Sequence, residues 1–201
     1  MKTTIISLFT LAFSLTGLMA QATFTNDDRG TAIGHLEKTK AEIMYAVKDL
    51  NDAQLNFKAT PDSWSVANCL EHITSSESFI LGFIEKSLEG EANPAMRSEL
   101  KFSDGQIVTM ITDRSQKAQA PEPLRPTEAF GSPETTLKTF LERRQQTVDF
   151  VANTQRDLRI HFLDFPFGKI DALQGVLFLS AHSERHLKQI QEVKANENFP
   201  K

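Results

Sequence analysis

A single cysteine, Cys69, is present among the 201 residues, so no intramolecular disulfide can form in any compartment. A small domain held together by disulfides is therefore excluded, and the fold must be stabilised by burial of apolar side chains. A lone thiol is safest when buried, and the apolar helical pattern around Cys69 predicts that it is buried.

Positive charge is also scarce, because 22 Lys and Arg residues stand against 26 Asp and Glu residues, for a net charge of −4. Nucleic-acid binding is therefore disfavoured, since no overall positive field could neutralise phosphates, although a local basic patch stays open. Tryptophan and tyrosine occur once each, whereas phenylalanine occurs 15 times, which predicts a core filled by phenylalanine. Apolar residues make up 40% and charged residues 24%, as is typical of one soluble globular domain.

The first 22 residues have the pattern of a cleavable signal peptide. Lys2 gives a short positive segment, residues 5–18 are mainly apolar, and Ala20 and Ala22 are the small residues that a signal peptidase requires. A retained membrane anchor is the less favoured alternative, because the apolar run is short for a bilayer span and no basic segment follows it. We therefore expect a signal peptide at 1–22 and a domain at 23–201 that is periplasmic or secreted, without a stable membrane anchor.

Apolar residues at helical spacing predict two long helices in the first half of the chain. The first is expected at about 28–50, and the second, at about 65–88, should end at Gly90. Leu55 and Phe57, in the connector between these helices, could close one end of a bundle.

The second half of the chain predicts two more long helices after an irregular middle. Within residues 91–131, a short helix is expected at 103–117, followed by three prolines that favour extended chain. The third long helix should begin with Ser132 as N-cap and Pro133 in its first turn, and the fourth should cover about 171–194 after a connector rich in phenylalanine. Because no stretch alternates convincingly as a strand, we predict an all-α fold, a four-helix bundle.

Three histidines are predicted to point into the core of this bundle. At about 100° per residue, the second helix has one broad apolar arc, and His72 lies within it. The apolar members of this arc are Val66, Cys69, Ile73, Phe79, Ile80, Phe83 and Ile84. On the fourth helix, His186 lies on the face that is predicted to be buried, with His182 one turn earlier. Imidazoles at i and i+4 can converge on one cation, and a histidine in a core must hydrogen-bond, stay neutral or bind something.

Each part of this pattern has an ordinary explanation when it is taken alone. One buried histidine is more often a satisfied core group, and an isolated His-x-x-x-His is more often not a ligand pair. Three core-directed imidazoles on facing helices are harder to explain by packing, so we predict one divalent metal ion at His72, His182 and His186. Three protein ligands leave coordination positions open to water or substrate, which is the pattern of a catalytic site. His35 and His161 are expected on the surface or in a connector.

The neighbours of these histidines are weaker candidates for the site. Glu71 and Glu184 adjoin them in sequence, but neighbours on a helix point about 100° apart, so Glu184 should be solvated or ion-paired. Gln189 shares the metal-facing side and could hold a water beside the metal. Trp64 is expected to pack at the start of the second helix, and Arg185 to be a surface charge.

Several segments resemble the DinB-like, or DinB/YfiT-like, family of metalloenzymes. Residues 61–72, PDSWSVANCLEH, are similar to the family's second-helix motif, and residues 181–190, AHSERHLKQI, to its fourth-helix motif. The proline-rich segment 121–126, PEPLRP, and residues 132–143 are similar to its middle segment and third helix. The resemblance covers nearly all of the chain after the expected signal peptide.

This resemblance implies a four-helix bundle with a metal, most often nickel or zinc, held by His72, His182 and His186; iron or manganese are further options. It also implies a metal-dependent hydrolase or transferase that acts on a small molecule. Characterised relatives use low-molecular-weight thiols, which are scarce outside the cytoplasm, so the expected export argues against thiol transfer here.

Two functions of different classes follow from the sequence. Open coordination favours an enzyme, whereas the lack of an evident general base favours a non-catalytic, metal-stabilised binding or sensor module. The expected partner is a small-molecule substrate or ligand, with no nucleic acid, and a homodimer stays open.

Overall fold

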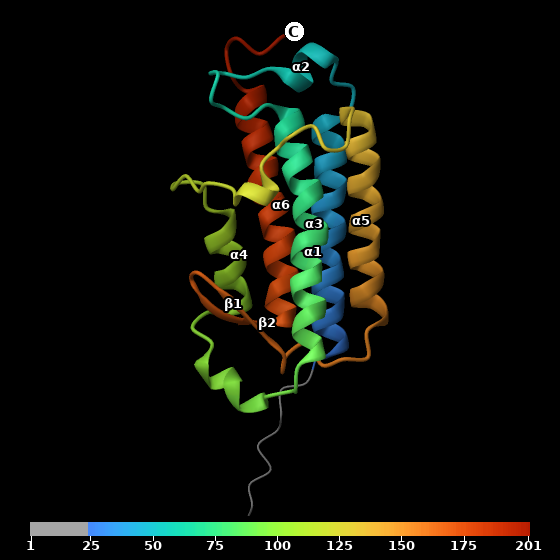
Figure 1. Cartoon of the computed structure of the whole chain (residues 1–201), viewed down its shortest axis with the longest axis vertical. Helices are drawn as coiled ribbons and strands as arrows, with labels where there is room; N and C mark the ends of the chain where they lie inside the picture. Colours follow the sequence, from blue (N-terminus) through green and yellow to red (C-terminus); the bar gives the residue numbers. More distant parts are fainter. Residues whose placement is uncertain (1–23) are drawn as a thin grey trace, which may run out of the picture.

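The computed structural model describes residues 24–201 and shows four long helices lying side by side (Figure 1). These helices are α1 (Asn26–Val47), α3 (Val66–Glu89), α5 (Pro133–Asn153) and α6 (Ala172–Lys194). The predicted four-helix bundle is therefore confirmed. The expected signal peptide lies outside the described residues. Within the described part of the chain, none of the helices combines the length and apolar character needed to cross a bilayer.

Side-chain caps fix where the long helices begin. Thr25, Ser65 and Asp171 each cap a helix within a capping box, in which two side chains and two backbone N–H groups pair reciprocally. Ser132 caps α5, as predicted from the Ser-Pro pair. Gly90 is the C-cap of α3, but its φ of −74° shows that the left-handed backbone often found at such glycines is not used.

The order of the helices around the bundle places α1 diagonally opposite α3. Each of these two helices packs on both α5 and α6. In Figure 1, α1 and α6 run upwards, whereas α3 and α5 run downwards. The neighbours α3 and α5 are therefore parallel, and because α3 has 24 residues, the chain must return about 36 Å before α5 can begin.

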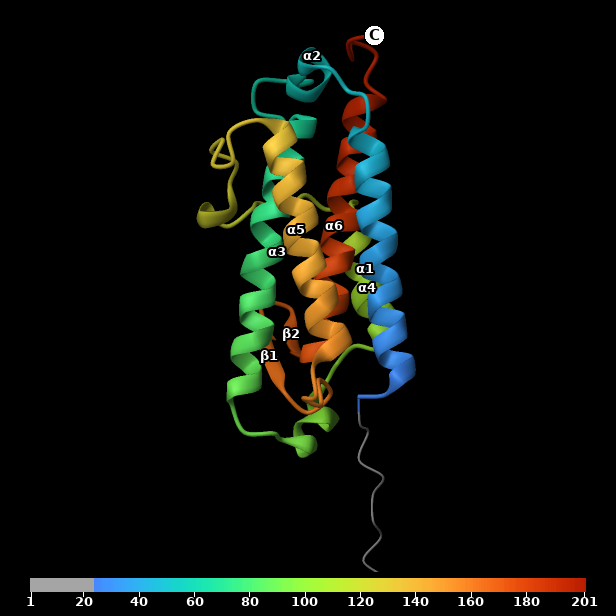
Figure 2. The ribbon, with the colours of Figure 1, turned by 90° about the vertical axis from the view of Figure 1, so that its right-hand side faces the viewer.

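The segment between α3 and α5 makes this return along the outside of the bundle. It contains the 3-10 helix η1 (Pro94–Glu99), the helix α4 (Asp104–Thr112) and the 3-10 helix η2 (Glu122–Leu124). Helix α4, shorter than the predicted 103–117, packs along α6 (Figures 1 and 2). We call residues 120–131, which contain η2 and the prolines, the strap. The connector between α1 and α3 holds the one-turn helix α2 (Asp52–Asn56).

A small antiparallel hairpin precedes α6, so the prediction that no strand is present was wrong. Strands β1 (Phe162–Phe165) and β2 (Gly168–Asp171) pair with Phe165 opposite Gly168. Gly168 has a φ of 136°, a backbone conformation that is essentially restricted to glycine. The hairpin escaped the sequence analysis because each strand has only four residues, which is too short for a clear alternation.

A buried polar layer separates two apolar clusters along the bundle. Each of the four long helices contributes to it, through Thr39, Glu77, Arg144 and Ser183 respectively. Arg144 is fully buried and donates all five of its N–H groups, two to Glu77 and the others to Thr39, Ser183 and the carbonyl oxygen of Leu36. Because every donor is satisfied, the charge can be held in the core.

The predicted apolar arc of α3 is only partly correct. Cys69 is buried, as expected, and so are the valine and the three isoleucines of the arc. Phe79 and Phe83 are instead 43% and 50% exposed. Helical periodicity gives the direction of a side chain but not what packs against it, and nothing in the described chain covers this part of the face.

Candidate metal centre

His72 on α3 comes together with His182 and His186 on α6 where the two helices pack against each other. One nitrogen of each ring lies within 4.8 Å of those of the other two, and Nε2 of His72 is 3.2 Å from Nε2 of His182. The ring centroids are 4.5 to 5.0 Å apart. The structure therefore brings together all three histidines that the sequence indicated. Among residues 24–201, no other group of His, Cys, Asp and Glu side chains has this arrangement.

Hydrogen bonds at the outer ring nitrogens aim two of the three imidazoles. Nδ1 of His72 lies 2.8 Å from the carbonyl oxygen of Leu124, and Nδ1 of His186 lies 2.9 Å from Oε1 of Gln189. Both partners can only accept, so Nδ1 carries the proton in each ring and Nε2 keeps a lone pair for the shared space. Gln189, expected on the metal-facing side, thus contacts His186 directly.

The ring of His182 is held by stacking. Its Nε2 faces His72, whereas its buried Nδ1 has no hydrogen-bond partner among the described residues. The ring lies nearly parallel to that of Phe178, one helical turn earlier, with the centroids 6.0 Å apart and an interplanar angle of 15°. Phe178 therefore provides the orientation that a carbonyl or amide oxygen provides for the other two rings.

Burial lowers the pKa of all three histidines, because it disfavours the charged imidazolium. The hydrogen bond to Leu124 partly opposes this effect on the pKa of His72. For His182, burial comes first and the two neighbouring imidazoles add to it, so its pKa lies well below the usual value. Burial, reinforced by His72 and opposed by Gln189, lowers the pKa of His186 to about 3. All three rings are therefore neutral at pH 7, the form that can bind a metal cation.

Glu71, next to His72 in sequence, points away from the histidines and holds the strap. Its carboxylate accepts hydrogen bonds from the backbone N–H groups of residues 127–129, at 2.8, 3.1 and 2.9 Å. Glu128 has a φ of 63°, and this left-handed residue turns three successive N–H groups towards one anion. Since the strap residue Leu124 accepts from His72, α3 fixes the strap at two consecutive residues.

Gln189 is itself fixed by Arg114, which follows α4. The Arg114 guanidinium donates to Gln189 at 3.4 Å and makes two hydrogen bonds to Glu192, at 2.8 and 2.7 Å. A chain of contacts therefore runs from Glu192 through Arg114 and Gln189 to His186. Sequence reasoning missed Arg114, because 75 residues separate it from Gln189 and no local pattern marks it.

The remaining predicted neighbours of the site have structural roles. Glu184 is ion-paired with Lys188 at 3.4 Å, as expected. Arg185, predicted as a surface charge, is half-buried and donates to backbone carbonyl oxygens of Ile111, Asp113 and Gln116, at and beyond the end of α4. It therefore attaches the C-terminal end of α4 and the segment that follows it to α6.

Trp64 lies beside the three histidines, whereas His35 and His161 lie outside the group. Trp64 lies just before the N-cap of α3, as expected, and its ring is 5.0 Å from that of His72 and 5.8 Å from that of His186. His35 is half-buried on α1. His161 lies in the connector before β1, as expected, and is buried there, with Nδ1 3.2 Å from the carbonyl oxygen of Ser87.

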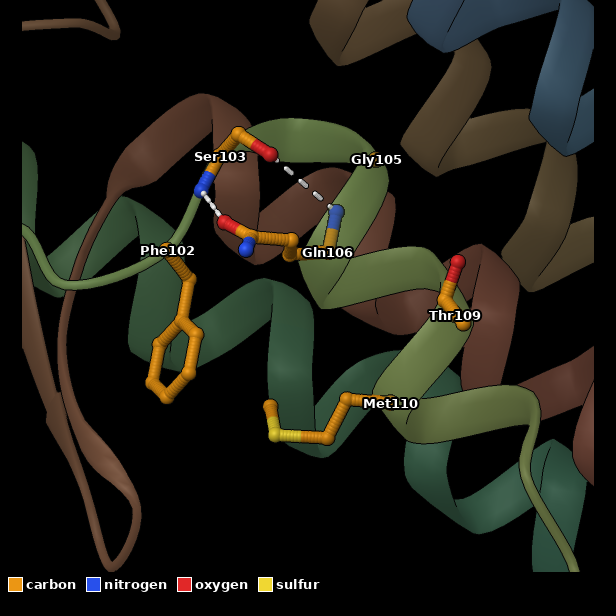
Figure 3. A pocket seen from close by; sticks show the side chains of 6 residues that line it. All are labelled: Phe102, Ser103, Gly105, Gln106, Thr109 and Met110. Atoms are coloured by element: carbon orange, nitrogen blue, oxygen red, sulfur yellow. Dashed lines mark hydrogen bonds between the residues drawn. The ribbon is translucent and has the colours of Figure 1, made fainter.

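A hollow of about 580 Å³ lies at the start of α4, apart from the three histidines. Figure 3 shows Phe102 and Met110 pointing to the same side of it, beside the capping pair Ser103 and Gln106. The other lining residues are Gly105 and Thr109, so no titratable side chain faces this hollow.

Comparisons with known proteins agree with the fold. An uncharacterized protein of Bacillus subtilis strain 168, YuaE, is 25% identical over 158 residues, which are 78% of this chain and 93% of that protein. The structure of YfiT from Bacillus subtilis, described as a probable metal-dependent hydrolase with an unusual four-helix bundle topology, superposes with a TM-score of 0.58. It is 18% identical and covers 88% of this chain and 91% of YfiT, which shows a shared fold. Residues 35–190 match the DinB superfamily, and the chain belongs to this superfamily.

Proposed function

We propose that the chain uses a divalent metal ion, held by His72, His182 and His186, to catalyse hydrolysis or group transfer on a small molecule. The observation that carries this proposal is the convergence of three neutral imidazoles, two buried and one half-buried, from two helices on one space. Three nitrogen donors suit nickel or zinc, with iron or manganese as further options. Such an ion, when bound, polarises a carbonyl or phosphoryl oxygen and makes water more acidic. The description of YfiT as a probable metal-dependent hydrolase supports the proposal.

The residues that contact the three histidines orient the rings. Glu71 and Glu77, the buried acidic residues of α3, are occupied by the strap N–H groups and by Arg144. No carboxylate joins the three imidazoles in the part of the chain that the structure describes. This lack of a general base is the observation that favours the alternative, a non-catalytic binding or sensor module.

Metal analysis of purified protein and of single variants tests the site. We expect about one equivalent of metal per chain, lost in both His72→Ala and His186→Ala with unchanged helix content by circular dichroism. His35→Ala is the matched control, since His35 lies on α1 outside the group, and it should keep its metal. Metal content that is the same in His186→Ala and His35→Ala would contradict the three-histidine site.

Activity screening then separates the two functions. The metal-loaded protein should hydrolyse at least one ester, amide, lactone or phosphoester, or transfer the acyl or phosphoryl group of that compound, and metal removal should abolish the reaction. Stoichiometric metal without turnover of any of these classes would instead favour the binding module.

We also propose that the chain is exported, on the strength of the apolar segment 5–18 followed by Ala20 and Ala22. Terminal sequencing of the protein from its native host should find Thr23, or Gln21, as the first residue. An intact Met1 in the membrane fraction would contradict export with cleavage.

A further inference from the structure

A row of half-buried phenylalanine rings begins beside the histidines. Phe178 stacks on His182, the ring of Phe165 lies 4.6 Å from Phe178, and that of Phe167 lies 6.1 Å from Phe178. Phe165 and Phe167 come from the β1–β2 hairpin and Phe178 comes from α6, so the hairpin and the helix that follows it build one apolar surface. We call Phe165, Phe167 and Phe178 the aromatic row.

Helix α3, which carries His72, also has phenylalanine side chains towards the end of the bundle where the aromatic row lies. Phe79 and Phe83 follow His72 by seven and eleven residues, which places them within about 20° of the same side of α3. Both are about half exposed, and their rings are 5.0 Å apart. Because α3 and α6 run in opposite directions, the turns after His72 and the turn before His182 lie towards the same end of the bundle (Figure 1).

The surroundings of the row contain little that would bind a charged group. Lys169, on the hairpin, is already paired with Asp164 at 2.8 Å. Lys101 lies beside the hairpin through its aliphatic part, since its Cδ is 3.8 Å from the position of a Cβ atom on Gly168. Phe102 continues the row, with its ring 6.2 Å from Phe167, and borders the hollow of about 580 Å³ at the start of α4. Half-open apolar rings that adjoin a polar site are typical of a substrate-binding surface, in which the apolar part fixes the position of the reacting group.

We propose that the aromatic row binds the apolar part of the substrate, an aromatic ring or a short acyl chain, while the attached polar group faces His72, His182 and His186. This inference rests on the proposed function and narrows its substrate class to aryl or alkyl acyl compounds. Stacking of Phe178 on His182, with the ring centroids 6.0 Å apart, is the contact that joins the two parts of the site.

Two hydroxamic acids with the same metal-binding head test the proposal in the zinc-loaded protein. Acetohydroxamate carries one methyl group and benzohydroxamate a phenyl ring. Trp64 is the single tryptophan and lies within 6 Å of two of the three rings, so its fluorescence reports binding at the site. Since each buried CH₂ group strengthens binding about fourfold, we expect benzohydroxamate to bind at least ~10-fold more tightly. Equal dissociation constants would overturn the proposal.

A variant of the row and a matched control then locate the effect. Phe165→Ala should weaken benzohydroxamate binding by about fivefold or more while leaving acetohydroxamate binding and zinc content unchanged. The control Phe150→Ala removes another half-buried phenylalanine, on α5, which carries none of the three histidines, and should change neither. Equal weakening of both ligands in Phe165→Ala would also overturn the proposal.

Failure of the proposed function would look different from failure of this inference. If the protein binds none of zinc, nickel, iron and manganese, the three-histidine site is excluded. The row is then tested with benzamide against acetamide, which carry the same two apolar groups without a strong metal-binding head. Tighter binding of benzamide that is lost in Phe165→Ala would support the row, and equal binding would overturn it.

Discussion

Replacing Glu71 by glutamine should release the strap from α3. One carboxylate oxygen accepts two backbone N–H groups and the other accepts a third. Glutamine keeps the shape of the side chain but replaces one of these oxygens by an NH₂ group, so at least one strap N–H then faces a donor. Glu71 is only 7% exposed, so water cannot easily replace the lost acceptor. A hydrogen bond to a charged group contributes about 1.5–3 kcal/mol, and an unsatisfied buried donor costs about 1–3 kcal/mol.

We therefore expect the free energy of unfolding of Glu71→Gln to fall by about 2–4 kcal/mol. Because the strap residue Leu124 accepts the hydrogen bond that orients His72, the affinity for metal should also fall, by about tenfold. Guanidinium unfolding gives the first quantity, and competition with a chromophoric chelator gives the second.

Glu184→Gln is the matched control for this experiment. Glu184 also adjoins a histidine in sequence, but it is paired only with Lys188 at the surface, an interaction that contributes about 0–1 kcal/mol. Unfolding free energies of the two variants that agree to within about 0.5 kcal/mol would refute the role given to Glu71.

Two further predictions concern stability. Burial would raise the pKa of the Asp104 carboxyl, but hydrogen bonds from Arg159 outweigh it, so this pKa lies below its usual value of 3.8. The stabilisation by Asp104 is therefore complete above pH 3.8 and is lost as the pH falls through the lower, folded-state pKa. Asp104→Asn should therefore flatten the acid limb of a plot of unfolding free energy against pH, and an unchanged limb would contradict this. A Cβ atom on Gly175 would lie 3.0 Å from Cγ1 of Ile84, so Gly175→Ala should destabilise the fold by about 1–3 kcal/mol, measured by denaturant unfolding. Gly34→Ala, with nothing within 4 Å of the added atom, should stabilise α1 by about 0.5–1 kcal/mol, and the same sign for both variants would refute the argument.

The long helices and the three histidines could be predicted because their signals are local. Ser132 before Pro133 marks the start of α5 within two residues. The spacing of His182 and His186 places both on one side of α6, whichever element faces them. Such signals depend only on the periodicity and capping chemistry of one helix, so they hold in the folded chain.

The rest of the site could not be predicted, because it depends on contacts between distant segments. Glu71 and the strap residues that it binds are separated by 56 to 58 residues. The burial of Arg144 depends on Glu77, Thr39 and Ser183, which lie on three other helices. The exposure of Phe79 and Phe83 was missed for the opposite reason, since periodicity assumes that an apolar face is covered.

The diagonal placement of α1 and α3 has a consequence for synthesis of the chain on the ribosome. Domains form as their contacts become available, from the N-terminus onwards. Helix α1 packs on α5 and α6, so its bundle partners emerge only after residue 132 has been made. The last helix, α6, contacts α1, α3 and α4 and carries two of the three histidines. Synthesis of α6 therefore completes both the bundle and the three-histidine group, and a chain that stops before residue 172 can form neither.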